Sequence, residues 1–180
     1  MKTFSEYKNN GRILLFDVDD TLVHTTARIG IIKNGIVTKK ISNKNFNDYN
    51  LRPGESFDFT EFSDYKHLEK EIPTKYLDTL KREYKKGSQI GILTARNSCQ
   101  GIKKFLKKHN IDIDKNFIFA TDDPKLGLSG TVNQRKSEVI SILYHRGYTT
   151  FIFFDDSEKN LESAKALEKV FGIDVVTIKT

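Results

Sequence analysis

The stretch Leu14-Leu15-Phe16-Asp17-Val18-Asp19-Asp20-Thr21-Leu22 decides the fold of this chain. Its apolar run, Ile13–Phe16, is far too short for a membrane span. An almost wholly apolar short run is typical of a strand covered on both faces. Acidic residues follow directly where this strand would end. The same combination recurs near the other end of the chain, where Phe151–Phe154 is followed by Asp155-Asp156-Ser157.

Short apolar strands alternate with amphipathic helices along most of the chain. The other expected strands are Gln89–Leu93, Phe117–Ala120 and Val175–Ile178. The expected helix starts are Pro73, Ser98, the region near Gln134, and Ser157, and the expected helix stops are Gly87, Gly147 and Gly172. This alternation predicts an α/β fold, a doubly wound parallel Rossmann-like sheet of about five core strands with right-handed crossovers. In such sheets the functional site lies beyond the carboxyl ends of the strands.

Residues 23–72 do not follow this alternation. Two apolar runs, Ala27–Ile32 and Ile36–Ile41, flank Lys33-Asn34-Gly35. Asn-Gly between apolar runs predicts a β-hairpin, because both central turn positions favour positive φ. We therefore expect one domain over residues 1–180, with residues 23–72 forming a small flap, or minimal cap, inserted after the first strand.

Aromatic and acidic residues interleave in the second half of this segment. The aromatic residues are Phe46, Tyr49, Phe57, Phe59, Phe62 and Tyr65, and the acidic ones are Asp48, Glu55, Asp58, Glu61 and Asp64. Such aromatic side chains can form a platform on which bases stack. However, Arg52 is the only basic residue between positions 46 and 65, and a phosphate backbone would be repelled. We therefore favour a packed flap over a stacking surface.

Composition narrows the class of protein. Hydrophobic residues make up 37% and charged residues 30%, which is a globular balance and not a disordered one. The net charge of +6 suits an anionic partner, nucleic acid included, although a generally lysine-rich composition explains it as well. A single cysteine, Cys99, excludes an internal disulfide framework. The stretch MKTFSEYKNNGR has no apolar core and so is no signal peptide, and we expect a cytoplasmic protein.

The acidic residues that follow the two strands predict a metal site. If the strands are neighbours, Asp17, Asp19, Asp155 and Asp156 meet at one edge of the sheet. Such a cluster needs a counter-charge to stay ionised, and hard oxygen ligands with few His or Cys residues nearby indicate Mg²⁺. The alternative is that these residues only cap helices and form turns. Two such pairs, each directly after an apolar strand, favour the metal site.

Other residues at the expected sheet edge suit a phosphate group. Thr94 ends a strand and offers a hydroxyl, together with the loop amides that follow at Ala95 and Arg96. Lys136 opens the third helix and can act as a point charge on phosphate, with Lys125 as a rival. Arg96 either touches substrate or is a solvated or salt-bridged arginine. His24 as a second acid–base group and Cys99 as a nucleophile are weak candidates, because neither has supporting partners.

These residues fall into the four motifs of a known family, and the chain resembles the haloacid dehalogenase (HAD) phosphohydrolase superfamily. The D-x-D-x-[TV] motif appears as Asp17-Val18-Asp19-Asp20-Thr21, and the second motif ends in Thr94. The third matches Lys136, and the fourth appears as Asp155-Asp156. All four occur in family order over about residues 12–180, excluding the flap. With its short flap, the chain resembles minimal-cap phage and bacterial HAD phosphatases.

The resemblance implies a phosphoric monoester hydrolase that works through an aspartyl-phosphate. In that scheme Asp17 is the nucleophile, and Asp19 is the general acid and later the general base. The cofactor Mg²⁺ would be held by the Asp17 carboxylate, the Asp19 backbone carbonyl and Asp155, and Asp156 would bind or orient a metal-bound water. The phosphoryl oxygens would be held by Thr94 and Lys136. Many members carry a further acid after the fourth motif, where this chain has Glu158 and Asn160 as candidates for an outer shell.

The resemblance leaves the substrate open between a small nucleotide or sugar phosphate and a nucleic-acid end, because a short flap also admits a large substrate. Basic residues on two expected helices either form an approach for nucleic acid or are solvated helix faces; they are Lys81, Arg82, Lys85, Lys86, Lys103, Lys104, Lys107 and Lys108. Two other functions remain as alternatives. One is a phosphoacceptor switch, which the order of the acidic residues disfavours, and the other is a catalytically inactive HAD fold used for binding.

Overall fold

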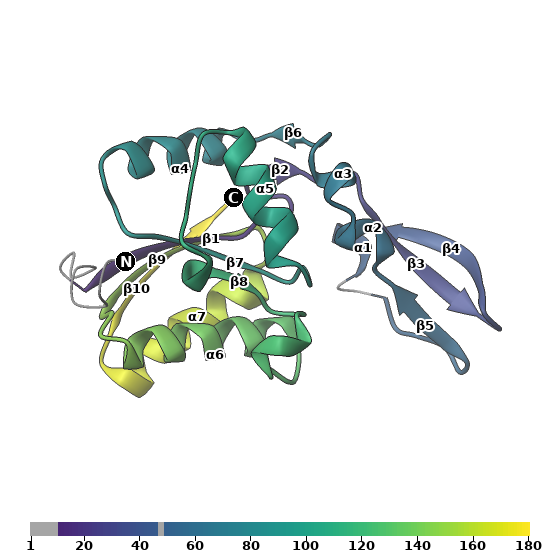
Figure 1. The fold of residues 1–180 in the computed structure, drawn as a ribbon. Coiled ribbons are helices and arrows are strands. Elements are labelled where there is room, and N and C mark those ends of the chain that lie inside the picture. The colour runs from purple at the N-terminus through teal and green to yellow at the C-terminus, as the bar shows by residue number, and fades with distance from the viewer. Residues whose placement is uncertain (1–10, 47–48) are drawn as a thin grey trace.

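The computed structural model describes residues 11–46 and 49–180 (Figure 1). The stretch judged not to be a signal peptide falls almost entirely before residue 11, and Asp48 of the acidic set lies in the second gap, so both are outside the described residues. No helix within the described ranges combines the length and the apolar character that crossing a membrane requires.

A five-stranded parallel sheet forms the centre of the molecule. Its order is β10-β9-β1-β7-β8. The strands are β1 (Arg12–Phe16), β7 (Ile90–Thr94), β8 (Ile118–Ala120), β9 (Thr150–Asp155) and β10 (Asp174–Lys179). Each coincides within two residues at either end with a strand predicted from an apolar run. The expectation of an α/β, Rossmann-like parallel sheet is therefore confirmed.

Helices cover both faces of this sheet. One face carries α4 (Lys75–Lys85) and α5 (Cys99–Lys108), and the other carries α6 (Val132–His145) and α7 (Glu158–Phe171), as Figure 1 shows. Short 3₁₀ turns, η2 (Lys115–Phe117) and η3 (Pro124–Leu126), flank β8. With both faces covered, the central strand β1 is buried from Ile13 to Phe16, which is why its sequence is continuously apolar.

The helix starts show where local signals succeed and fail. Ser98 caps α5 as expected, because its side chain accepts the Gly101 backbone N–H. The start expected at Pro73 is wrong, because Pro73 lies in the short strand β6 (Ile72–Pro73) and Thr74 caps α4 instead. A capping threonine competes well here because its hydroxyl satisfies a helix N–H that proline cannot.

The third and fourth helices also differ in detail from the expectation. The helix expected near Gln134 begins two residues earlier, because the Gln134 side chain accepts the N–H of Thr131 in a capping box. Ser157 precedes α7 as expected, but its side chain makes no capping hydrogen bond. Its backbone N–H donates instead to Asp155, which ties the start of this helix to the end of β9.

The strand order places a crevice beside the end of β1. Because β7 and β9 lie on opposite sides of β1, the chain leaves the centre of the sheet in both directions, and ligands bind at such switch points. Below this edge the rings of Phe16 and Phe154 stack at 4.3 Å between centroids. Gly91 lies opposite Leu15 in the ladder, and a Cβ there would come within 2.9 Å of the leucine side chain. The residues that follow β1, β7 and β9 are therefore held together by a tightly packed layer.

Residues 23–72, called the flap from here on, leave the central sheet and extend beyond its carboxyl edge (Figure 1). At the root of the flap, β2 (Val23–His24) pairs antiparallel with β6. Its main part is a three-stranded antiparallel sheet of order β4-β3-β5, joined to three single-turn helices. These elements are β3 (Arg28–Lys33), β4 (Ile36–Ser42), β5 (Glu55–Asp58), α1 (Asn43–Phe46), α2 (Thr60–Ser63) and α3 (Tyr65–Leu68).

The flap is held by its own small cluster and by a buried carboxylate. Asn34 and Gly35 form the hairpin turn with φ of 54° and 76°. The buried residues Ile29, Ile31 and Ile41 pack against partly buried aromatic side chains of the same segment. At the root, Glu71 Oε1 accepts the backbone N–H groups of Thr26 at 2.8 Å and Ala27 at 3.2 Å.

Candidate active site

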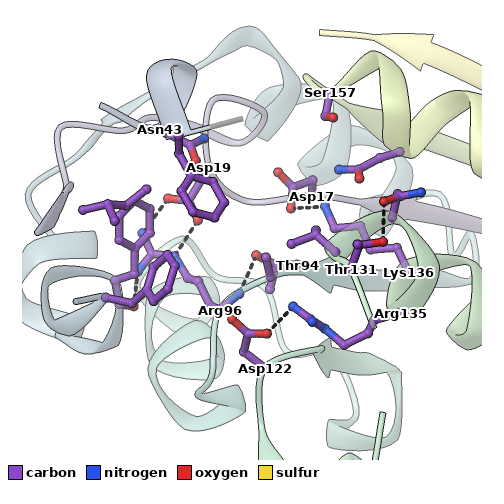
Figure 2. Close-up of a pocket in the computed structure, with 18 of the residues that line it drawn as sticks. Asp17, Asp19, Asn43, Thr94, Arg96, Asp122, Thr131, Arg135, Lys136 and Ser157 are labelled. Carbon is purple, nitrogen blue, oxygen red and sulfur yellow. Dashed lines mark hydrogen bonds and ion pairs between the residues drawn. The ribbon is translucent and has the colours of Figure 1, made fainter. Parts of the chain in front are cut away.

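A buried lysine joins the ends of two neighbouring strands. Lys136 lies in the first turns of α6, and its Nζ donates to Asp17 Oδ1 at 2.9 Å and to Asp155 Oδ2 at 2.7 Å. All three side chains are almost completely buried. Figure 2 shows Lys136 pointing at Asp17. The rival, Lys125, is exposed on η3, so the structure favours Lys136 as the lysine of this site.

Burial governs the ionisation of this group. Burial raises the pKa of Asp17 well above its ordinary value, the nearby Asp155 and Asp156 raise it further, and Lys136 opposes them. For Lys136, burial lowers the pKa, but the two carboxylates outweigh burial and hold it above its ordinary value. The ammonium therefore stays charged and compensates the carboxylates. Burial, followed by the charge of Asp155, raises the pKa of Asp156 to about 6.

Three carboxylates are close enough to share a cation. Oxygen atoms of Asp17, Asp155 and Asp156 all lie within 4.8 Å of one another, so the cluster could hold a metal ion. Asp155 is oriented by the Ser157 N–H at 2.8 Å and by the Asn160 side-chain amide at 2.9 Å. The donor set consists of hard carboxylate oxygens, which suits Mg²⁺. Asn160 thus has the outer-shell position that the sequence suggested for it or Glu158.

The side chain of Asp19 lies outside this cluster and faces the other way. Its Oδ2 accepts from Arg96 Nε at 2.8 Å, and its Oδ1 accepts from Arg96 Nη2 at 2.7 Å. The hydroxyl of Thr25 donates to the same Oδ1 at 2.6 Å. Of the two roles considered for Arg96, the structure therefore shows the salt bridge. The metal contact expected for Asp19 was through its backbone carbonyl, and that stays a prediction.

Arg96 also reaches the flap. Its Nη1 donates to the backbone carbonyl of Phe62 at 2.9 Å, and its guanidinium lies 5.5 Å from the centroid of the Phe62 ring. One buried side chain therefore connects the loop after β7, the loop after β1 and the flap. The flap is joined to the site by the Arg96–Phe62 hydrogen bond, and the same arginine makes the two-point ion pair with Asp19, so the flap and the site are not independent units.

Thr94 and the loop after it line the same cavity as the lysine. Thr94 is completely buried at the end of β7, and its hydroxyl accepts the backbone N–H of Arg96 at 3.4 Å. The cavity has a volume of about 590 Å³, and Asp17, Thr94, Ala95 and Lys136 all line it. Neither His24 nor Cys99 is among the described residues that line the cavity. The Cys99 thiol instead donates to the Ile118 carbonyl.

Sequence reasoning missed an ion pair on the cavity wall. Asp122 and Arg135 both line the cavity and contact each other through their charged groups (Figure 2). A signal for Asp122 was present, because it comes two residues after the strand Phe117–Ala120, close to the same edge of the sheet as Asp17. Burial raises the pKa of Asp122, and Arg135 opposes that rise. Arg135 directly precedes Lys136 on α6, so one helix turn presents two cations to the site.

The lysine-rich helix faces do not contribute to this cavity. None of the eight basic residues noted on α4 and α5 is among the described residues that line it. Five of them pair with nearby acids: Lys81 with Asp78, Arg82 and Lys86 with Glu83, Lys103 with Asp112, and Lys108 with Glu69. These contacts favour the interpretation of the basic residues as solvated helix faces.

Comparison of the chain with protein-family models, with curated proteins and with solved structures found no match. Function must therefore be inferred from the residues and their geometry. The structure brings Asp17, Thr94, Lys136, Asp155 and Asp156 to one edge of the sheet, as the order of the strand ends predicted.

Proposed function

We propose that this chain is a Mg²⁺-dependent phosphatase that hydrolyses a phosphomonoester with Asp17 as the nucleophile. The observation that carries the proposal is the placement of Lys136 between Asp17 and Asp155, in a cavity that Thr94 also lines. Support also comes from the resemblance to the HAD superfamily, because the residues of all four motifs gather at this cavity. In that scheme residues 23–72 are a minimal cap.

The reaction would occur in two displacements at phosphorus. A carboxylate oxygen of Asp17 forms a bond to phosphorus while the ester P–O bond breaks, and the leaving oxygen takes up a proton. Water then attacks the aspartyl-phosphate, which releases inorganic phosphate and restores the carboxylate. Thr94 and Lys136 hold the phosphoryl oxygens, and Lys136 offsets the charge of Asp17. Asp17, Asp155 and Asp156 would hold Mg²⁺, which when bound would supply further positive charge for the phosphoryl oxygens.

Asp19 would supply the proton to the leaving oxygen. Both of its oxygens accept hydrogen bonds from Arg96 in this structure, and a carboxylate in that state has no proton to give. The proposed role therefore requires the Asp19–Arg96 pair to open when substrate enters. Since Arg96 also holds the flap at Phe62, movement of the flap is a route to that opening.

Phosphate release from a substrate panel tests the proposed function. The panel is p-nitrophenyl phosphate, nucleoside monophosphates, sugar phosphates, and oligonucleotides with 3′ or 5′ phosphate, each with Mg²⁺ and with EDTA. We expect Mg²⁺-dependent release that Asp17→Asn lowers by at least about 1,000-fold, because it removes the nucleophile. Asp78→Asn is the matched control, since Asp78 is a largely exposed carboxylate on α4. Well-folded protein that releases phosphate from no substrate would overturn the proposal and favour a switch or a binding module.

A further inference from the structure

Five aromatic side chains of the flap line the same cavity as Asp17 and Lys136. We call them the aromatic wall; they are Phe46, Tyr49, Phe57, Phe59 and Phe62. The rings form a connected set, with centroid distances of 4.8 Å for Phe46–Phe57, 5.5 Å for Phe46–Phe59 and 6.4 Å for Phe59–Phe62. The wall therefore presents a continuous aromatic surface to the site.

Phe59 is the most exposed ring of the aromatic wall. The other four pack against the buried cluster of Ile29, Ile31 and Ile41, whereas Phe59 is not part of that cluster in the described chain. Phe59 is 36% exposed. Among the described aromatic residues, its ring contacts those of Phe46, Phe57 and Phe62, which all belong to the wall. A large apolar side chain exposed inside a cavity is a feature of binding sites. Its free surface points to a ligand with an apolar, planar part.

The other side chains that line the cavity suit a charged group on the same ligand. Lys136, Thr94 and the carboxylate cluster occupy one part of it, and a phosphate there fills only a fraction of about 590 Å³. In Figure 2, Arg96 and Asn43 lie on one side of Asp17, and Lys136 and Arg135 lie on the other. Pockets of this size with a few convergent polar groups hold whole small molecules. The ligand must therefore join a phosphate to a planar apolar group.

We propose that the substrate is a nucleoside monophosphate whose base stacks on Phe59 while its phosphate lies at Asp17. The inference rests on the proposed phosphatase function and names its substrate class. A sugar phosphate would leave the aromatic wall without a planar partner. An oligonucleotide would need contacts for further phosphates, and none of the basic residues of the lysine-rich faces is among the described residues that line the cavity.

Substrate discrimination by Phe59 variants tests the inference. We compare kcat/KM for nucleoside monophosphates with kcat/KM for glycerol 2-phosphate, which has no planar group. Phe59→Ala is expected to lower that ratio about 10- to 100-fold, the usual effect of losing one base–aromatic stack. Phe59→Trp should keep the ratio near that of the unmodified protein. Val170→Ala, which truncates an exposed apolar side chain on α7 outside the cavity, should leave both values unchanged.

A binding measurement separates this inference from the proposed chemistry. The probe is a nucleoside 5′-phosphonate, in which carbon replaces the ester oxygen so that no hydrolysis can occur, titrated calorimetrically into the whole protein with Mg²⁺. Binding that Phe59→Ala weakens 10- to 100-fold supports the base site, even if no substrate is hydrolysed, in which case the phosphatase function alone fails. Equal binding to both proteins overturns the base site. A greater than tenfold preference for oligonucleotide ends over mononucleotides overturns the assignment to a mononucleotide.

Discussion

Replacing Lys136 by methionine tests the electrostatic logic of the site. Methionine keeps much of the length of the side chain but removes the ammonium that bonds Asp17 at 2.9 Å and Asp155 at 2.7 Å. The two carboxylate side chains are only 6% and 0% exposed, so water cannot replace the lost partner. Removing one partner of a buried ion pair lowers the free energy of unfolding by about 3–5 kcal/mol.

The free energy of unfolding, measured with urea in the absence of metal at pH 7, should therefore fall by about 3–5 kcal/mol. For a chain of 180 residues, this corresponds to a melting temperature lower by roughly 6–20 °C. Added Mg²⁺ should stabilise the variant more than the unmodified protein, because the variant has one more uncompensated negative charge at the cluster. Phosphatase activity should be lost in the same variant.

Lys86→Met is the matched control for this prediction. Lys86 also pairs with a carboxylate, Glu83 at 2.8 Å, but its side chain is 59% exposed. Exposed pairs contribute at most about 1 kcal/mol, so this variant should stay within that margin. If Lys136→Met also unfolds within about 1 kcal/mol of the unmodified protein and responds to Mg²⁺ no more strongly, Lys136 does not compensate the cluster and our reasoning is wrong.

Two further predictions concern the neighbouring side chains. Because burial and Asp155 raise the pKa of Asp156 to about 6, Mg²⁺ affinity measured by calorimetry should fall steadily as the pH drops below about 6. Constant Mg²⁺ affinity from pH 5 to 8 would contradict this account. In metal-free protein, stability has the opposite dependence on pH: the folded state binds more protons than the unfolded state between the ordinary Asp pKa of 3.8 and about 6, so Asp156 makes stability fall as pH rises through that window. Arg96→Ala removes the ion-pair partner of the buried Asp19 carboxylate and should lower the free energy of unfolding by about 3–5 kcal/mol. Arg96→Lys should recover only part of this free energy, because lysine cannot reproduce the two-point contact. Equal melting temperatures for Arg96→Ala and the unmodified protein would show that the pair does not hold the site.

Local patterns predicted the sheet well because its strands are buried on both faces. Continuous apolar runs such as Ile13–Phe16 have few alternatives to a central strand, and the structure has strands at all five predicted places. The hairpin turn followed from Asn34-Gly35, where both residues have positive φ. Helix starts were less certain, because Thr74 and Pro73 are adjacent and both suit a helix N-terminus. Such choices depend on contacts that a short window of sequence does not contain.

The sequence by itself determined the α/β class, the edge of the sheet that carries the candidate site, and the residues Asp17, Thr94 and Asp155 that end or directly follow its strands. Parallel strands place their carboxyl ends at one edge, so residue type and position after a strand were sufficient. Only the tertiary structure decided that Lys136 and not Lys125 lies between two carboxylates, that Arg96 pairs with Asp19, and that the aromatic residues of the flap line the cavity. These contacts join residues as far apart as 119 positions, and their geometry depends on how the flap and α6 pack at the sheet edge.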